Sequence, residues 1–284
     1  MDNVSNNLRL NIRTESKLLK QKYKLLGIAH HHPVWNFWHL FRLDEVNFRS
    51  DNVYVWQTRE YSEHNYLVSY DYASKNDQLN LLASISELGD FGVQFFSFYG
   101  KKVSRDLIDS VIEINYLDTQ LEVSKIANLS VLDIGAGYGR FAYRLISAFP
   151  NAKVTCVDAI PISTSISKVY LKQMIESSSV QVSDLSEVGA LKKDFYHLAI
   201  NIHSFSEMSI ESIRFWIKIL VENKVKYIFI VPNKDSLSLN DGTDFGYLFS
   251  EAGYKIFDSR KKYSDSESDE LGIYPSTYFL LELA

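Results

Sequence analysis

The stretch Val131-Leu132-Asp133-Ile134-Gly135-Ala136-Gly137-Tyr138-Gly139-Arg140 decides the fold of this 284-residue chain. An apolar run enters it, glycines alternate with other residues, and an amphipathic helix pattern follows. This order predicts a buried strand, a tight turn and the N-terminus of a helix. Because glycine has no Cβ, a ligand can lie directly against the backbone amides of such a turn. The stretch therefore predicts a ligand-binding turn at the end of a strand.

The spacing of the glycines narrows what this turn binds. It reads G-x-G-x-G, whereas the dinucleotide fingerprint is G-x-G-x-x-G, and no lysine follows as in a phosphate-binding P-loop. Asp133 stands two positions before the first glycine, and Asp158 ends the next apolar run, 19 residues beyond Gly139. An acid at about that offset binds a ribose diol in Rossmann-like units, so we expect a nucleoside ligand.

These features resemble the class I S-adenosylmethionine-dependent methyltransferases. In that family the first motif reads acid-x-G-x-G-x-G and the second strand ends in the ribose-binding acid, and Asp133 and Asp158 match those positions. The resemblance implies an α/β fold with a Rossmann-like, seven-stranded sheet, mostly parallel with its last strand antiparallel. It also implies S-adenosyl-L-methionine as the cofactor.

The pattern after residue 130 points independently to the same fold. Strand-like and helix-like segments alternate, which predicts a parallel sheet with helices on both faces. Strands are expected from 131, at 152–158, 180–182, 195–202 and 226–231, and helices at 139–148, 167–176, 210–222 and 245–251. Pro161 is expected to open a loop. Two last strand-like runs, 254–263 and 277–283, are joined by the acidic loop Ser264 to Glu270 without a helix, which predicts antiparallel neighbours.

Residues before about 100 lack this alternation. Helices are expected at 15–28, 76–88 and 105–127, with aromatic residues clustered between the first two, namely Trp35, Trp38, Tyr54, Trp56, Tyr61 and Tyr66. We expect two domains: residues 1–100 as a mainly helical, aromatic-rich cap, and residues 101–284 as the cofactor domain. Because ligands bind outside the carboxyl ends of the strands in doubly wound folds, a cap at that edge would shape the acceptor pocket.

Composition excludes several classes of protein. The chain is 46% hydrophobic and 23% charged, as globular proteins are, and its net charge of −5 argues against nucleic-acid binding. The single cysteine, Cys156, rules out a disulfide framework and fits a reducing compartment. No apolar run approaches the ~18 residues of a membrane span, and the polar start lacks the apolar core of a signal peptide. We expect a cytoplasmic protein; its oligomeric state stays open.

Three pieces narrow the resemblance to the putative sugar O-methyltransferases of bacterial surface-polysaccharide enzymes. They are Ser104 to Ser110 (SRDLIDS), Ile134 to Arg140 (IGAGYGR) and Asn201 to Met208 (NIHSFSEM). The family usually has aspartate–leucine–proline after the second strand, where this chain reads Asp158-Ala159-Ile160-Pro161. Its first motif commonly opens with glutamate where Asp133 stands. The N-terminal third matches more loosely.

The resemblance also implies roles for single residues. The backbone of Gly135, Gly137 and Gly139 would contact the amino-acid and ribose parts of the cofactor. Asp133 would hold its ammonium and Asp158 its ribose diol, with Ala159 near the adenine. Asp184, past the third strand, would contact the adenine amine or serve only as a turn or capping residue. The remaining candidate cofactor contacts are Ala136, Tyr138, Asn201 and Arg105, the last being alternatively a solvated surface arginine.

Two residues after the fourth strand compete as the catalytic base. His203 would accept a hydroxyl proton at neutral pH if its pKa stays near ~6.5. Glu207 is the rival, although it directly precedes a helix and could instead complement the helix dipole. The run His30-His31-His32 is read as a surface or packing feature, since adjacent histidines do not point at one centre and Pro33 ends the segment. No metal site is expected.

The leading hypothesis is therefore an enzyme that methylates a sugar hydroxyl of a nucleotide-linked sugar or surface-glycan precursor, in polysaccharide biosynthesis. Aromatic residues in the cap fit this acceptor because flat rings stack on sugar faces. Two alternatives stay open. One keeps the cofactor and changes the acceptor to a phosphate, an amine or another small metabolite. The other is a methyltransferase-like binding subunit without turnover.

Overall fold

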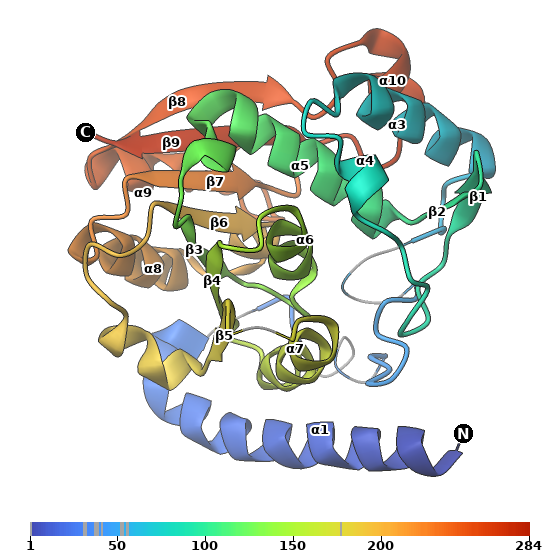
Figure 1. Cartoon of the computed structure of the whole chain (residues 1–284). Coiled ribbons are helices and arrows are strands. Elements are labelled where there is room, and N and C mark those ends of the chain that lie inside the picture. The colour runs from blue at the N-terminus through green and yellow to red at the C-terminus, as the bar shows by residue number, and fades with distance from the viewer. Residues whose placement is uncertain are drawn as a thin grey trace.

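A seven-stranded sheet forms the centre of the protein (Figure 1). The structure, a computed structural model, describes residues 2–30, 33–36, 40, 42–51, 54, 57–176 and 178–284. The strands are β3 (Ser130–Ile134), β4 (Lys153–Val157), β5 (Val180–Ser183), β6 (Leu198–Ile202), β7 (Tyr227–Val231), β8 (Tyr254–Lys261) and β9 (Thr277–Leu283). Their order is β5-β4-β3-β6-β7-β9-β8, and only β9 runs antiparallel to its neighbours. The predicted α/β sheet with a reversed last strand is confirmed.

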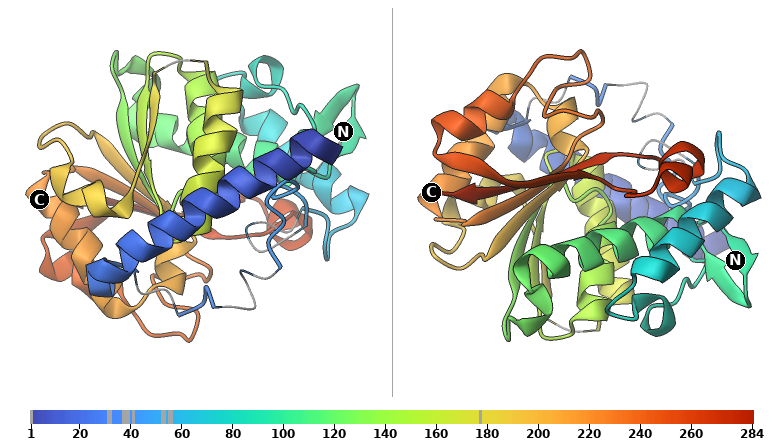
Figure 2. Two further views of the ribbon diagram at one scale, coloured as in Figure 1. Left: turned by 90° about the horizontal axis from the view of Figure 1, so that it is seen from below. Right: turned by 90° about the horizontal axis from the view of Figure 1, so that it is seen from above.

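Helices cover both faces of this sheet (Figure 2). They are α5 (Arg105–Leu121), α6 (Arg140–Ala148), α7 (Pro161–Met174), α8 (Ile210–Glu222) and α9 (Gly246–Glu251). Because successive side chains of a strand point to opposite faces, the central strands β3, β4, β6 and β7 contribute to two cores. Val131 and Val154 pack in the core with α5, α6 and α7, whereas Leu132 and Ile228 pack in the core with α8 and α9. These four strands are buried on both sides, whereas the edge strand β8 is mostly exposed.

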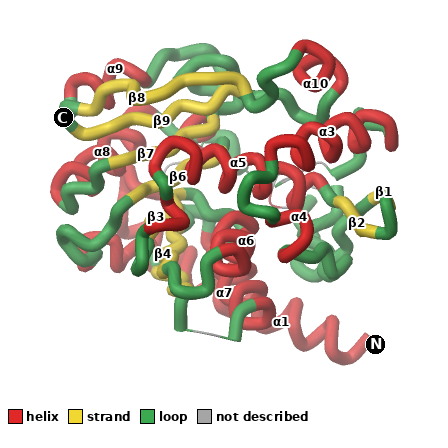
Figure 3. The backbone as a smooth tube through the Cα atoms, turned by 45° about the horizontal axis from the view of Figure 1, so that its top comes forward, coloured by secondary structure: helices red, strands yellow, loops and turns green. Residues whose placement is uncertain are grey.

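The N-terminal elements lie on different sides of the sheet domain (Figure 3). They are α1 (Asp2–Tyr23), the 3-10 helix η1 (Lys24–His30), α3 (Glu63–Asn76), α4 (Leu81–Ser84), β1 (Phe96–Phe98) and β2 (Lys101–Val103). Helix α1 packs along α7, and α3 packs against α5 and against α10 (Ser266–Leu271). The division of the chain at residue 100 stays a prediction.

Several expected boundaries were wrong, each for a local reason. The first helix begins at Asp2, well before residue 15, and the expected helix at 76–88 is reduced to the four residues of α4. Helix α3 was missed; it begins with a capping box in which Ser62 and Asn65 bond each other's backbone. Pro161 opens helix α7 rather than a loop, because proline fits the first helical turn. The acidic segment after Ser264 forms α10, N-capped by Asp265.

Three further short 3-10 helices connect the sheet to its helices, namely η2 (Val123–Lys125), η3 (Leu185–Ala190) and η4 (Ser204–Glu207). Helix η4 follows β6 directly and therefore brings its side chains to the carboxyl edge of the sheet. None of the helices in the described part of the chain has the length and apolar character needed to span a membrane.

A buried network of charges joins the N-terminal segment to α5 and α6. Arg49 donates to Glu87 at 2.8 Å and to Asp106 at 3.0 Å, and Arg144 donates to Glu87 at 2.8 Å. All four side chains are at most 1% exposed. Burial by itself raises the pKa of Glu87, but the guanidinium groups of Arg144 and Arg49 lower it to about 2. The carboxylate therefore stays ionised and holds the three segments together.

Candidate functional site

The glycine turn lies against the segment that follows β6. Gly135 has a φ of +73°, and a Cβ added there would lie 2.2 Å from the Oγ of Ser204. Only glycine therefore permits this approach. The backbone amides of Gly135 and Ala136 both point back to the carbonyl of Val157, at 2.8 and 3.3 Å, which fixes the turn against the end of β4. The predicted glycine turn is thus formed where β3, β4 and β6 end, and ligand binding there stays a prediction.

A cavity of about 110 Å³ opens at this edge of the sheet. The residues that line it are Trp35, Tyr54, Arg105, Asp109, Asp133, Gly135, Ala136, Gly137, Tyr138, Arg140, Phe141, Asp158, Ile160, Ile202, His203, Ser204 and Glu207. It lies outside the carboxyl ends of the strands, where ligands bind in doubly wound α/β folds. Nine of the residues named from the sequence therefore meet in one place.

Asp158 is fixed on the floor of this cavity. Its Oδ2 accepts from the amide of Gly137 at 2.8 Å, and its Oδ1 accepts from the amide of Ile160 at 2.7 Å. Burial raises the pKa of Asp158 to about 7, although these two amides lower it. Each carboxylate oxygen can accept more than one hydrogen bond, so the group retains capacity for two hydroxyls of a ligand.

Asp133 carries a hydrogen-bonding atom without a partner. Its side chain is 4% exposed, and its Oδ2 has no hydrogen bond within the described residues. Burial raises the pKa of Asp133 to about 7; Arg140 acts against this shift, and Asp158 adds to it. A buried carboxyl oxygen without a donor is costly, so this atom marks a place for a donor supplied by a ligand.

Four predicted cofactor residues do not line the cavity. Gly139 and Ala159 lie beside it in sequence, and the side chain of Asn201 bonds the carbonyl of Ile134 and the amide of Phe205. Asn201 thus braces the turn rather than facing the ligand space. Asp184 accepts from Lys22 and Lys168, which lower its pKa against the effect of burial, and it N-caps η3. Its predicted adenine contact stays a prediction.

His203 lines the cavity, but its surroundings change its chemistry. Burial lowers the pKa of His203 to about 3, and the positive charges of Arg105 and Arg140 lower it further. The expectation of an imidazole near its ordinary pKa was therefore wrong. The rings of His203 and Tyr274 meet edge-on, with 5.3 Å between their centroids. The Nδ1 of His203 has no hydrogen-bond partner among the described residues. His203 is a neutral polar group facing the ligand space.

Glu207 also faces the cavity rather than capping a helix. Ser209 is the N-cap of α8, so Glu207 does not cap that helix, and its possible effect on the helix dipole stays untested. Its Oε2 accepts from the indole of Trp35 at 2.7 Å. Burial raises the pKa of Glu207, although hydrogen bonds from Trp35 and Asn233 act against the shift. A carboxyl group of this kind is a stronger base than an ordinary glutamate.

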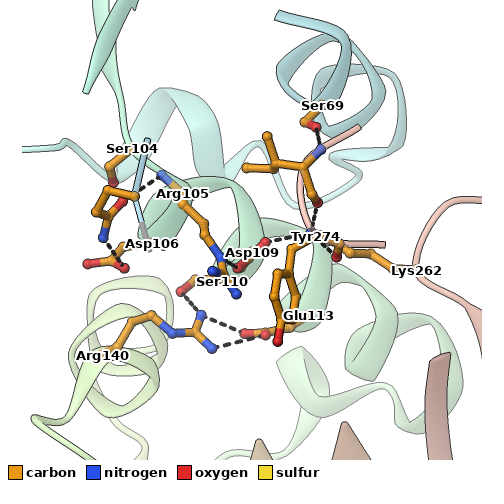
Figure 4. Close-up of polar contacts among 12 residues, drawn as sticks. Ser69, Ser104, Arg105, Asp106, Asp109, Ser110, Glu113, Arg140, Lys262 and Tyr274 are labelled. Atoms are coloured by element: carbon orange, nitrogen blue, oxygen red, sulfur yellow. Dashed lines mark hydrogen bonds and ion pairs between the residues drawn. The ribbon is translucent and has the colours of Figure 1, made fainter. Parts of the chain in front are cut away.

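A buried charge cluster centred on α5 contributes Arg105, Asp109 and Arg140 to the lining of the cavity, and Figure 4 shows the contacts within this cluster. Arg140 donates to both oxygens of Glu113, at 2.8 and 3.0 Å, and Arg105 donates to Asp109 at 3.0 Å. Lys262 donates to the other oxygen of Asp109 at 2.6 Å. Sequence reasoning named Arg105 but missed Asp109 and Arg140, although Asp109 follows Arg105 by four residues and so shares its helix face.

Two aromatic residues of the N-terminal segment, Trp35 and Tyr54, line one side of the cavity. The rings of Trp35 and Tyr54 lie 5.4 Å apart, and the hydroxyl of Tyr54 donates to Ser163 at 2.9 Å. Among the other residues singled out in this segment, Trp38, Trp56, His31 and His32 lie outside the described residues. Within the described ranges, no cluster of three or more His, Cys, Asp or Glu residues has a metal-binding arrangement.

Comparison with known proteins gives likenesses of fold at low identity. No family model and no curated protein matches the chain. Magnesium protoporphyrin IX methyltransferase (ChlM) from Synechocystis PCC 6803, crystallised with bound SAM, is 13% identical, covers 80% of this chain and 100% of its own, and gives a TM-score of 0.46. The [4+2]-cyclase SpnF is 10% identical over 78% of this chain and 96% of its own, with a TM-score of 0.45. A SAM-dependent methyltransferase from Aquifex aeolicus is 17% identical, covers 60% of this chain and 97% of its own, and gives a TM-score of 0.40. Likenesses of this size concern the fold alone and do not assign the reaction of these proteins to this chain.

The contact between Gly135 and Ser204 predicts a rescue experiment. We expect Gly135→Ala to lower the free energy of unfolding by about 1–3 kcal/mol, because the new Cβ overlaps Ser204 and the positive φ disfavours alanine. Adding Ser204→Gly should restore the share of the free energy of unfolding that is lost to the overlap. The share that is lost to the positive φ of alanine should remain. Urea unfolding of both variants and of Ser204→Gly alone measures this. No recovery in the double variant would show that the two segments are not in contact.

Proposed function

We propose that this protein is an S-adenosyl-L-methionine-dependent O-methyltransferase. The observation that carries the proposal is the pair Asp133 and Asp158, both buried at the glycine turn with a pKa raised to about 7 and both facing one cavity. A ligand with a ribose diol and an ammonium group supplies the donors that these carboxyl groups can still accept. The cofactor brings a methyl group bound to a positively charged sulfur, and it matches an acidic cavity.

The hydrogen-bonding groups of the site match those of that cofactor. Asp158 would take the ribose hydroxyls while keeping its bonds to Gly137 and Ile160, and the Oδ2 of Asp133 would gain its missing donor. A Cβ added at Gly137 would lie 3.7 Å from the ring of Tyr54, which is van der Waals contact, so this aromatic ring covers the glycine turn. Trp35 and Tyr54 would cover the ligand and exclude water.

Glu207 is proposed as the base and His203 as a positioning residue. The raised pKa of Glu207, caused mainly by burial, makes it the better proton acceptor, and the indole of Trp35 holds one oxygen so that the other can meet a hydroxyl. The imidazole of His203 stays neutral and holds a proton poorly. Its ring lines the cavity, where an imidazole nitrogen can orient an acceptor hydroxyl by a hydrogen bond.

A sugar hydroxyl is the proposed acceptor. The resemblance of three sequence elements to sugar O-methyltransferases and the rings of Trp35 and Tyr54 at the cavity support it. A phosphate or carboxylate acceptor is disfavoured because the cations at the cavity, Arg105 and Arg140, are already paired with Asp109 and Glu113. A cytoplasmic location follows from this reading, since nucleotide-linked sugars are made there.

Calorimetry tests the cofactor half of the proposal. The wild-type protein should bind S-adenosylhomocysteine, and Asp158→Ala should weaken binding by roughly tenfold to a hundredfold, since hydrogen bonds to a charged group contribute about 1.5–3 kcal/mol. Glu251→Ala, on the exposed side of α9, is the matched control and should bind as the wild type does. No binding by the wild type, or equal binding by Asp158→Ala, would reject the proposal.

The raised pKa of Asp133 predicts a pH dependence. Below about pH 7 the free protein holds this carboxyl protonated, and a cationic ammonium group needs it ionised, so binding releases a proton. Affinity for S-adenosylmethionine should therefore rise with pH up to about 7, by at most about tenfold per pH unit, and level off above. Asp133→Asn should remove the part of the slope that Asp133 contributes, while Asp158, whose pKa is also raised to about 7, keeps its own part. A wild-type profile without slope below pH 7 would contradict the assignment.

Turnover separates the two candidate bases. With nucleotide sugars as acceptors and mass spectrometry as the readout, Glu207→Gln should lower kcat by roughly 10²–10⁴ with little change in KM, as expected for loss of a general base. His203→Gln should act mainly on KM because it orients the acceptor. The reverse pattern would make His203 the base. Methyl found only on non-sugar acceptors would reject the sugar assignment but keep the cofactor.

A further inference from the structure

Helix α1 presents an uncovered face of unusual composition. Seen from below, it lies across the outside of the molecule with no element over it (Figure 2). Leu10, Leu18 and Leu25 are exposed by 64%, 58% and 87%, although leucine is usually buried. Lys17 and Lys20 are exposed beside the leucines of α1, and Lys24 is exposed next to Leu25 in η1, the 3-10 helix that directly follows α1. We name these six residues the basic leucine face.

The charge of this segment is opposite to that of the rest of the protein. Residues 2–30 contain six Lys or Arg against two Asp or Glu, a formal charge of +4, while the whole chain carries −5 and the remainder therefore −9. Other cations of the helix are already neutralised: Lys22 pairs with Asp184, and Arg13 pairs with Glu45. Within the described residues, no ion pair engages Lys17, Lys20 or Lys24.

The helix is fixed to the body, so its outer face is a property of the folded protein. Ile12, Leu19 and Tyr23 are buried on the opposite side, and the hydroxyl of Tyr23 bonds Thr164 at 3.2 Å and the amide of Leu185 at 3.0 Å. Glu15 pairs with Lys168 of α7. Anything that binds the basic leucine face therefore binds the whole molecule in one orientation.

We propose that the basic leucine face docks this protein on an anionic lipid surface. A helix with basic and apolar residues together on its outer face binds in the headgroup region, where lysines meet lipid phosphates and leucines enter the acyl boundary. The leucines are spread over roughly 20 Å of helix, which suits a flat surface better than one pocket of a protein partner. Nucleic acid would leave them in water. This docking does not depend on methyl transfer.

Vesicle sedimentation tests the proposal with the full chain. The wild-type protein should sediment with phosphatidylcholine vesicles that contain phosphatidylglycerol, and this binding should weaken as salt rises. With vesicles of phosphatidylcholine alone, the protein should stay in solution. Changing Lys17, Lys20 and Lys24 to Gln should lower the partition coefficient roughly a hundredfold. The matched control changes the exposed lysines Lys75, Lys193 and Lys234 to Gln and should bind much more tightly than that variant.

A second variant separates lipid from other anionic partners. Changing Leu10, Leu18 and Leu25 to Gln keeps the charge, and it should still lower vesicle binding at least tenfold, since each leucine loses a site in the acyl boundary. Circular dichroism and S-adenosylhomocysteine binding of all variants should match the wild type. No sedimentation of the wild type, an equal loss in the control, or unchanged binding by the leucine variant would overturn the proposal.

Discussion

The paired carboxylates of α5 are the constraint on which the site depends. Asp106, Asp109 and Glu113 are buried on one helix, and their partners come from the N-terminal segment, the glycine turn, α6 and the end of β8. A buried charge that loses its partner is strongly destabilising. The helix therefore admits only one arrangement of these segments, and this arrangement encloses the cavity.

The charges around the cavity fall into two groups with different uses. Asp109 at the cavity and Glu87 in the neighbouring network meet cations, and their pKa is lowered despite burial, whereas burial raises the pKa of Glu113 even though it pairs with Arg140. Asp133, Asp158 and Glu207 meet no cation at close range, and burial raises their pKa. The first group stabilises the fold. The second is left to interact with a ligand, and its negative sign suits a cation.

Most of the sheet and most helices after residue 130 were predictable because they have a strong local signal. The central strands are apolar on both faces, and α8 was predicted at its observed bounds, from Ile210 to Glu222. The acidic helix α10 lacks such a signal and was missed. The N-terminal third was not predictable either, because its elements have weak periodicity. Helix α3 buries tyrosines such as Tyr66 and Tyr70 within a polar sequence, and only contact with α5 and α10 makes it stable.

The sequence by itself determined the glycine turn, the two acids at Asp133 and Asp158, and the segment that brings His203 and Glu207 after β6. These follow from local chemistry, since backbone conformation and strand ends are encoded within a few residues. Only the tertiary structure decided that Trp35 and Tyr54 reach the cavity, that Arg105 and Arg140 are already paired, and that His203 stays neutral. Those properties depend on burial and on charges contributed by segments far apart in the chain.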